Sequence, residues 1–155
     1  MKLITWNCQG AFRKKVEVIL NELPDILVIQ ECEHTDKLEF SSKATAPTSY
    51  LWFGDNNNKG LGIFSYSNYK FRVFENYNPD FKTIVPISVS GGKFDFTIFA
   101  IWANNPHERR SRYIEQVWKA INYYEKILRN FSSLIINCSN RGTKSAKDEL
   151  SGCNS

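Results

Sequence analysis

The sequence predicts a mixed α/β fold, of the α+β kind, in a single domain. A strand–helix–strand pattern occupies residues 3–31, strands and turns fill residues 50–103, and a long amphipathic helix leads to one more strand ending at residue 137. A short crossover helix joins parallel strands, whereas tight turns join antiparallel ones. With 155 residues, 42% of them hydrophobic, the chain is long enough to bury one core.

The N-terminal pattern places two polar side chains at strand ends. Residues 3–8 read as a strand, apolar side chains recur at helical spacing over residues 12–23 until Pro24, and residues 26–31 form a continuous apolar strand that ends in Gln30 and Glu31. If the strands are parallel neighbours, Asn7 and Glu31 meet at one edge, where α/β sheets bind ligands. A buried carboxylate needs a partner. A Glu31 that points into solvent as the strand frays is the competing interpretation.

The middle of the chain predicts strands separated by turns. After a polar loop at 34–49 with a short helical turn, we expect strands at 50–54, 61–66, 71–77, 83–90 and 93–103. Residues 55–60 form a long turn, and Gly91-Gly92 a two-residue hairpin turn. Pro86 favours an edge or bulged position for its strand.

The C-terminal part predicts a helix, a strand and a polar tail. The apolar face of the helix consists of Ile114, Val117, Trp118, Ile121, Tyr124, Ile127 and Leu128. Residues 133–137 read as a buried strand, and residues 139–155 as a disordered or loosely attached tail. The domain is therefore predicted to end at residue 138.

Composition limits the possible partners and compartment. The net charge of +4 is compatible with a phosphate-bearing partner without demanding one. Four cysteines without CxxC spacing argue against a zinc site and favour a reducing, cytoplasmic location. The N-terminus lacks a signal-peptide core, and no apolar run is long enough to span a membrane, so no membrane partner is expected. The sequence does not indicate an oligomeric state.

Three motifs, ITWNCQG, PDILVIQE and GLGIFS, together resemble the endonuclease/exonuclease/phosphatase family, the DNase I-like and exonuclease III-like metal-dependent phosphodiesterases. The resemblance runs from residue 2 to about residue 137. It implies a DNase I-like two-layer β-sandwich flanked by helices. It also implies phosphodiester hydrolysis with Mg²⁺, or Mn²⁺ in its place, on nucleic acid or another phosphodiester.

The resemblance also implies functional residues. Glu31 matches the family's metal-binding Glu. Asn7 matches its active-site Asn, which lies beside the metal and the scissile phosphate, and is expected to be a second metal ligand. Tyr113 matches loosely as a catalytic side chain, and His107 and Arg112 as phosphate contacts. The competing interpretations are an exposed residue before the helix for His107, the first apolar helix position for Tyr113 and a solvated basic helix start for Arg112. Lys59 and the basic run at 13–15 carry the same ambiguity.

The sequence departs from the family after Ile136. Where the family has Gly-Asp-x-Asn, this chain has Asn137-Cys138-Ser139-Asn140, so Asn140 keeps the motif's Asn while Cys138 replaces its Asp. A thiol is a poor ligand for Mg²⁺. The family's later Asp-His pair is absent, which leaves the second half of the fold incomplete. We expect a truncated or frameshifted member, with a genuinely diverged terminus as the alternative.

Two functions follow from the resemblance and its limits. The first is a Mg²⁺-dependent phosphodiesterase or nuclease that is catalytically impaired. The second is a non-catalytic remnant, or a pseudo-enzyme that binds phosphate or nucleic acid. A weaker third is an interaction module whose exposed sheet face recruits a partner.

Overall fold

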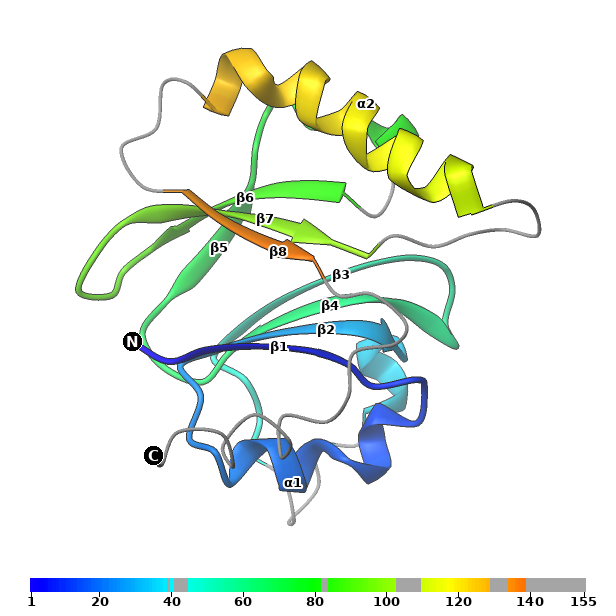
Figure 1. The fold of residues 1–155 in the computed structure, drawn as a ribbon. Coiled ribbons are helices and arrows are strands. Elements are labelled where there is room, and N and C mark those ends of the chain that lie inside the picture. Colours follow the sequence, from blue (N-terminus) through cyan, green and yellow to red (C-terminus); the bar gives the residue numbers. More distant parts are fainter. Residues whose placement is uncertain (39, 41–44, 82–83, 103–109, 129–133, 139–155) are drawn as a thin grey trace, which may run out of the picture.

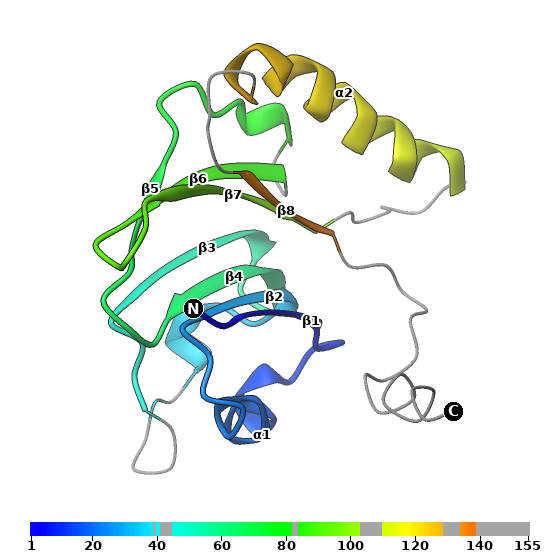
Figure 2. The same cartoon turned by 60° about the vertical axis from the view of Figure 1, so that its left-hand side comes forward.

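Two β-sheets stacked face to face form the body of the protein, with a helix outside each sheet (Figure 1). The computed structural model describes all residues except 39, 41–44, 82–83, 103–109, 129–133 and 139–155, and describes the backbone alone for 110–114, 126–128 and 134–138. Seen from a second direction, the layers run helix, sheet, sheet, helix (Figure 2). The predicted mixed α/β sandwich flanked by helices is confirmed.

The first sheet has the strand order β1-β2-β4-β3. Its strands are β1 (Leu3–Asn7), β2 (Ile26–Cys32), β3 (Ser49–Asn56) and β4 (Lys59–Ser65). β1 and β2 are parallel, as predicted, with Asn7 opposite Gln30, and the other pairs are antiparallel. The parallel pair therefore brings the carboxyl ends of β1 and β2 to one edge of the sheet.

The crossover between β1 and β2 is shorter than the predicted helix over residues 12–23. It consists of a 3-10 turn at Phe12–Lys14 and the helix α1 (Val16–Leu20). Leu23, predicted on the apolar face, is 82% exposed and has a positive φ. The physical reason is Pro24, because the residue before a proline is driven out of the helical region. The prediction was therefore wrong for the last turn.

The hairpin between β3 and β4 is tighter than the predicted long turn at 55–60. The strands continue to Asn56 and Lys59, so only Asn57 and Asn58 remain in the turn. The Asn56 side-chain oxygen accepts the Asn58 N–H at 3.0 Å, a local bond that closes the turn without glycine. The 3-10 turn at Thr35–Lys37 confirms the short helical turn predicted before this hairpin.

The second sheet has the strand order β5-β6-β7-β8. Its strands are β5 (Lys70–Val73), β6 (Ile84–Ser90), β7 (Phe96–Ile101) and β8 (Leu134–Cys138), with a 3-10 turn at Pro79–Phe81. β7 and β8 are parallel, and the other pairs are antiparallel. Each of the two sheets thus contains one parallel pair of strands.

Two predictions about the second sheet were wrong. Pro86 lies in β6, between β5 and β7 and not at an edge. It is tolerated because the regular ladder with β5 ends at Ile87. Beyond that point Pro86 takes part only as an acceptor, since its carbonyl accepts the Phe74 N–H at 3.2 Å. Gly91-Gly92 is not a two-residue turn, because the ladder resumes only at Phe96 and residues 91–95 form the loop.

Three apolar clusters hold the layers together. One lies between the sheets and draws on both of them, one lies between the first sheet and α1, and one lies between the second sheet and α2 (Arg110–Leu128). In α2, Ala120 and Tyr124 face the sheet, whereas Trp118, predicted on the apolar face, is 63% exposed. No helix among the described residues is long and apolar enough to cross a membrane.

Candidate active site

A β-bulge at the end of β2 sets the position of Glu31. Gln30 pairs with Leu61 and Cys32 pairs with Gly60, so Glu31 is an extra residue with no partner position in the ladder. Its φ is 59°, in the left-handed region that glycine usually occupies in bulges. Strained backbone of this kind is concentrated at functional sites.

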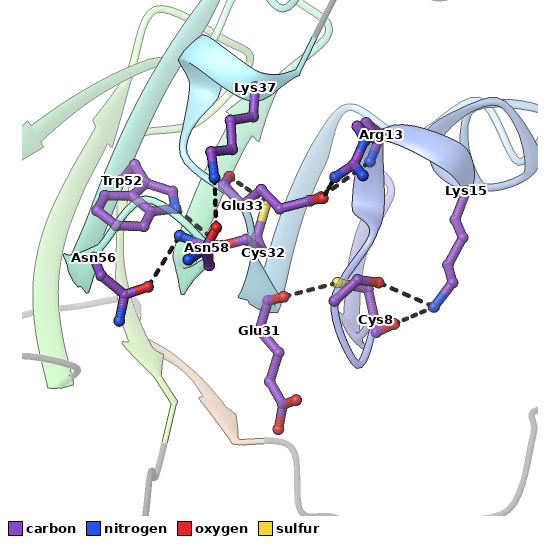
Figure 3. Close-up of polar contacts among 11 residues, drawn as sticks. Cys8, Arg13, Lys15, Glu31, Cys32, Glu33, Lys37, Trp52, Asn56 and Asn58 are labelled. Atoms are coloured by element: carbon purple, nitrogen blue, oxygen red, sulfur yellow. Dashed lines mark hydrogen bonds and ion pairs between the residues drawn. The ribbon is translucent and has the colours of Figure 1, made fainter.

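The bulge turns the Glu31 side chain out of both apolar layers. Along β2, Val28 belongs to the core between the sheets, whereas Leu27 and Ile29 belong to the core beside α1. Cys32 also belongs to the core beside α1, so the alternation has shifted by one residue. Glu31 absorbs the shift, and its carboxylate points away from the other labelled residues (Figure 3).

Glu31 is buried and paired. Its side chain is only 5% exposed, and its Oε2 lies 2.8 Å from the Lys59 ammonium nitrogen. The Asn7 side-chain N–H donates to Oε1 over a long 3.4 Å, and the backbone oxygen of Glu31 accepts from the Cys8 thiol at 3.3 Å (Figure 3 shows the thiol contact). The alternative of a frayed, solvent-facing Glu31 is therefore wrong.

Asn7 turns its donor group toward Glu31. The Asn7 side-chain oxygen accepts the Gln9 N–H at 3.0 Å, which leaves the nitrogen facing the carboxylate. The Cys8 N–H donates to the Gln30 carbonyl at 3.0 Å and continues the pairing of the two strands past Asn7. The predicted proximity of Asn7 and Glu31 is confirmed. Since a metal needs the amide oxygen, this geometry suits a hydrogen-bond role for Asn7 better than a ligand role.

Gln30 joins the two sheets at the same end of the sandwich. Its side-chain nitrogen donates to the Thr5 hydroxyl at 3.2 Å and to the carbonyl of Ile101, the last residue of β7, at 3.4 Å. Its side-chain oxygen is buried and has no hydrogen-bond partner among the described residues. Sequence reasoning noted Gln30 as polar but gave it no role, because the contact to β7 depends on how the sheets pack.

A second buried carboxylate nearby has a structural role. Glu33 forms an ion pair with the Arg13 guanidinium and also accepts the Arg13 backbone N–H at 3.3 Å. Lys15 donates to the carbonyl oxygen of Cys8 at 2.5 Å (Figure 3) and to that of Gly10 at 3.1 Å. Two members of the basic run at 13–15 therefore fasten the loop after β1, which supports the non-functional interpretation for them.

The thiols and the imidazole near the site do not form a metal centre. Burial raises the pKa of the Cys8 and Cys32 thiols, so both stay protonated near neutral pH. His34 packs edge-on against the Trp52 ring and pairs with Asp36. Across the described part of the chain, no three His, Cys, Asp or Glu side chains converge in a way that could hold an ion.

The structure describes the other predicted site residues only in part. His107 and Asn140 lie outside the described residues, as does the predicted tail at 139–155. Arg112 and Tyr113 lie in the first turns of α2, where the backbone alone is described. Cys138 ends β8 opposite Ile101, whose carbonyl contacts Gln30. The carboxyl end of β8 thus reaches the end of the sandwich where β2 ends (Figures 1 and 2).

Solved structures share this arrangement of sheets and helices. Truncated TDP2 from Caenorhabditis elegans matches with a TM-score of 0.58 and 18% identity over 86% of this chain and 58% of its own. The 3'-5' exonuclease NExo from Neisseria meningitidis matches with a TM-score of 0.54 and 21% identity over 88% and 56%. This chain has the DNase I-like fold.

The DNase I-like neighbours are longer than this protein. The chain spans little more than half of the TDP2 and NExo structures. NExo has also been solved as a 3' phosphatase bound to a product DNA hairpin, at 20% identity and a TM-score of 0.54 over 88% of this chain and 56% of that one. Neither a family model nor a curated protein matches the sequence.

One side chain at the end of β2 has the chemistry of a ligand for a divalent cation. Mg²⁺ is commonly held by one or two carboxylates, with waters and substrate phosphates completing its shell. Glu31 supplies a hard, buried carboxylate, and the Lys59 ammonium already shows that this carboxylate holds a cation. Glu31 is therefore the candidate ligand among the described residues at this edge of the sheet.

Proposed function

We propose that this protein carries a Mg²⁺-dependent phosphodiester-hydrolysing site centred on Glu31, which works at a reduced rate. The observation that carries the proposal is a buried, cation-paired carboxylate on a strained bulge, at the carboxyl ends of two parallel strands. The DNase I-like fold supports it. A nucleic acid is the favoured substrate, because NExo, which shares this fold, was solved with a DNA hairpin.

The site residues have separate roles in this proposal. A bound Mg²⁺ would polarise the phosphoryl oxygen and offset its developing charge. Glu31 holds that ion, and Mn²⁺ serves in its place. The Asn7 N–H keeps the Glu31 carboxylate in position and can donate to a phosphate oxygen. We also assign phosphate contacts to His107 and Arg112, and supporting catalytic roles to Tyr113 and Asn140.

The reduced rate follows from side chains that the site lacks. Cys138 stands where the resemblance calls for an Asp, and a mostly protonated thiol is a poor ligand for Mg²⁺. Loss of members of a concerted catalytic set commonly costs orders of magnitude in rate.

Hydrolysis of bis(p-nitrophenyl) phosphate tests the proposed activity without assuming a natural substrate. The metal-stripped protein should be inactive, Mg²⁺ or Mn²⁺ should start slow release of p-nitrophenol, and EDTA should stop it. Equal rates with EDTA and with saturating Mg²⁺ would contradict a metal-dependent site. The hydrolytic activity must co-elute with the protein through two chromatography steps, which excludes a contaminating hydrolase.

Binding without cleavage is the second candidate function. It is favoured by Cys138 and by the Lys59 ion pair, which leaves the Glu31 carboxylate neutralised. Fluorescence anisotropy of a fluorescein-labelled DNA hairpin, with a check of the hairpin for cleavage, distinguishes the binding protein from the enzyme. Salt-dependent binding with no cleavage at saturating Mg²⁺ supports the binding protein, and cleavage supports the enzyme.

We also place the protein in the reducing cytoplasm. Cys8 and Cys32 are buried free thiols in the structure. The test is whether Cys8 and Cys32 are reduced or oxidised in protein isolated from cells under acid quench. An oxidised Cys8 or Cys32 would argue against this location.

A further inference from the structure

Lys59 occupies the place beside Glu31 where a cation would bind. Its nitrogen lies 2.8 Å from Oε2, while Oε1 receives the Asn7 N–H at 3.4 Å. Both carboxylate oxygens therefore have partners already. A Mg²⁺ ion needs an oxygen at about 2.1 Å, and an ammonium on that oxygen stands in its way.

The hairpin fixes the backbone of Lys59 above the bulge. Lys59 begins β4 directly after the two-residue turn, and the next residue, Gly60, pairs with Cys32. The turn is anchored by the His34 N–H, which donates to the Asn57 carbonyl at 3.0 Å, and by Lys37, which contacts the Asn58 side chain. The Lys59 backbone is thus held in place, whichever way its long side chain turns.

The Lys59 side chain itself is free to leave. It is 38% exposed, whereas the Glu31 side chain is 5% exposed. An ammonium on a flexible stem can move into water at little cost, but a buried carboxylate cannot remain without a cation. The pair also carries no net charge, so it attracts a dication far less than an isolated carboxylate does.

We propose that Lys59 is an internal cation that competes with the divalent metal for Glu31 and so sets the metal concentration at which the site fills. This proposal rests on the proposed function, in which Glu31 is the metal ligand. A metal ion takes the carboxylate only when the Lys59 ammonium leaves it. The protein therefore binds Mg²⁺ or Mn²⁺ more weakly than its buried carboxylate alone would.

Titration with Mn²⁺, with free ion read by electron paramagnetic resonance, tests the proposal apart from activity. Lys59→Met should bind Mn²⁺ at least about tenfold more tightly than wild type, a change of about 1.4 kcal/mol. Lys37→Met removes an exposed positive charge from the lysine that contacts the same hairpin, and it should stay within about twofold of wild type. Equal affinity of wild type and Lys59→Met, or an equal gain in Lys37→Met, would overturn the competition.

Thermal unfolding measures the response to Mn²⁺ even if Lys59→Met is less stable than wild type, because the melting temperatures with and without the ion are compared for each variant. Without metal, Lys59→Met should melt below wild type, because the Glu31 carboxylate loses its ion pair with Lys59, and Mn²⁺ should raise its melting temperature more than that of wild type. The neutral pair Glu31→Gln with Lys59→Met should fold and show no Mn²⁺ response. A response of the double variant equal to that of Lys59→Met would place the metal elsewhere and overturn the proposal.

The outcomes separate the two proposals. If wild type and Lys59→Met bind Mn²⁺ equally through Glu31, the Lys59 competition fails and the metal site stands. If neither binds Mn²⁺ at millimolar concentration while both are folded, the metal site of the proposed function fails as well.

Discussion

At the scale of single residues, the sequence led to Asn7 and Glu31 but not to their partner. The proximity of the two followed from parallel strands ending together, which a crossover pattern predicts. The contact with Lys59 did not follow, because it requires the bulge at Glu31 and a short hairpin turn. The run of asparagines at residues 56–58 does not show how many of its residues belong to the turn. The sequence therefore left two interpretations of Lys59 open, a phosphate contact and a solvated basic side chain.

The Arg13–Glu33 ion pair should contribute to stability and not to the site. Glu33→Gln removes the charge of a 5% exposed carboxylate, while Arg13 is half-exposed and can return to water. We expect the free energy of unfolding to fall by about 1–2 kcal/mol in urea titrations, since hydrogen bonds to charged groups contribute that order. Arg13→Met should give a larger loss, because it leaves the buried Glu33 carboxylate without its paired cation, and the double variant should lose less than the sum. Full additivity would contradict a direct pair.

Alkaline pH should destabilise the protein. Burial raises the pKa of the Cys32 thiol and of the Tyr66 phenol in the folded state. The unfolded chain therefore loses these protons first, starting near a thiol pKa of roughly 8.5. Stability is complete below that pH and falls as pH rises, by up to about 1.4 kcal/mol per pH unit for each group. Unfolding free energies at pH 7 to 10.5 check this, and a smaller slope is expected for Cys32→Ala. A flat profile would contradict it.

At the scale of elements, the strands were predicted well and their ends were not. Apolar runs bounded by turn residues gave the strands around Val28, Ile63, Ile87 and Ile98. The hairpin ends were misjudged because the turn type depends on a local hydrogen bond, from the Asn58 N–H to the Asn56 side chain. The end of the first helix was misjudged because Pro24 drives Leu23 out of the helical region. Trp118 was misassigned, because the buried face of α2 is narrower than its run of apolar residues.

Adjacent tyrosines in α2 offer a matched test of how this helix is held. The Tyr124 ring is fully buried against Phe99, and its hydroxyl accepts the Asn78 N–H at 2.9 Å. The Tyr123 ring is half-exposed. We expect Tyr124→Ala to lower the free energy of unfolding by about 3–5 kcal/mol and Tyr124→Phe by about 1 kcal/mol. Tyr123→Ala should cost clearly less than Tyr124→Ala, and similar losses for the two would contradict this packing.

At the scale of the whole molecule, the sandwich explains why part of the site was unpredictable. Residues 1–66 carry Asn7, Glu31 and Lys59 in one sheet, while Gln30 reaches Ile101 in the other sheet. Sequence pattern assigns strands to sheets but does not say which backbone atoms meet across the sandwich. The DNase I-like fold itself was predictable from three short motifs.

The core between the sheets should make unfolding a single event. It joins side chains of β2 and β4 to side chains of β6 and β7, for example Val28 and Ile63 to Val85 and Ile98. We therefore expect one cooperative urea transition with an m-value of about 1–3 kcal/mol/M, the same by fluorescence and by circular dichroism. Two separate transitions, or a broad drift without a midpoint, would show that the sheets do not form one folding unit.

Nicking of supercoiled plasmid DNA by Glu31→Gln, compared with Glu33→Gln, tests the central claim most directly. Both residues are 4% exposed and lie two positions apart, but only Glu31 faces Asn7 and Lys59. At equal folded concentration in Mg²⁺, wild type and Glu33→Gln should nick slowly at similar rates, and Glu31→Gln should fall to the level of EDTA controls. Equal nicking by wild type and Glu31→Gln would contradict a metal-dependent phosphodiesterase site at Glu31.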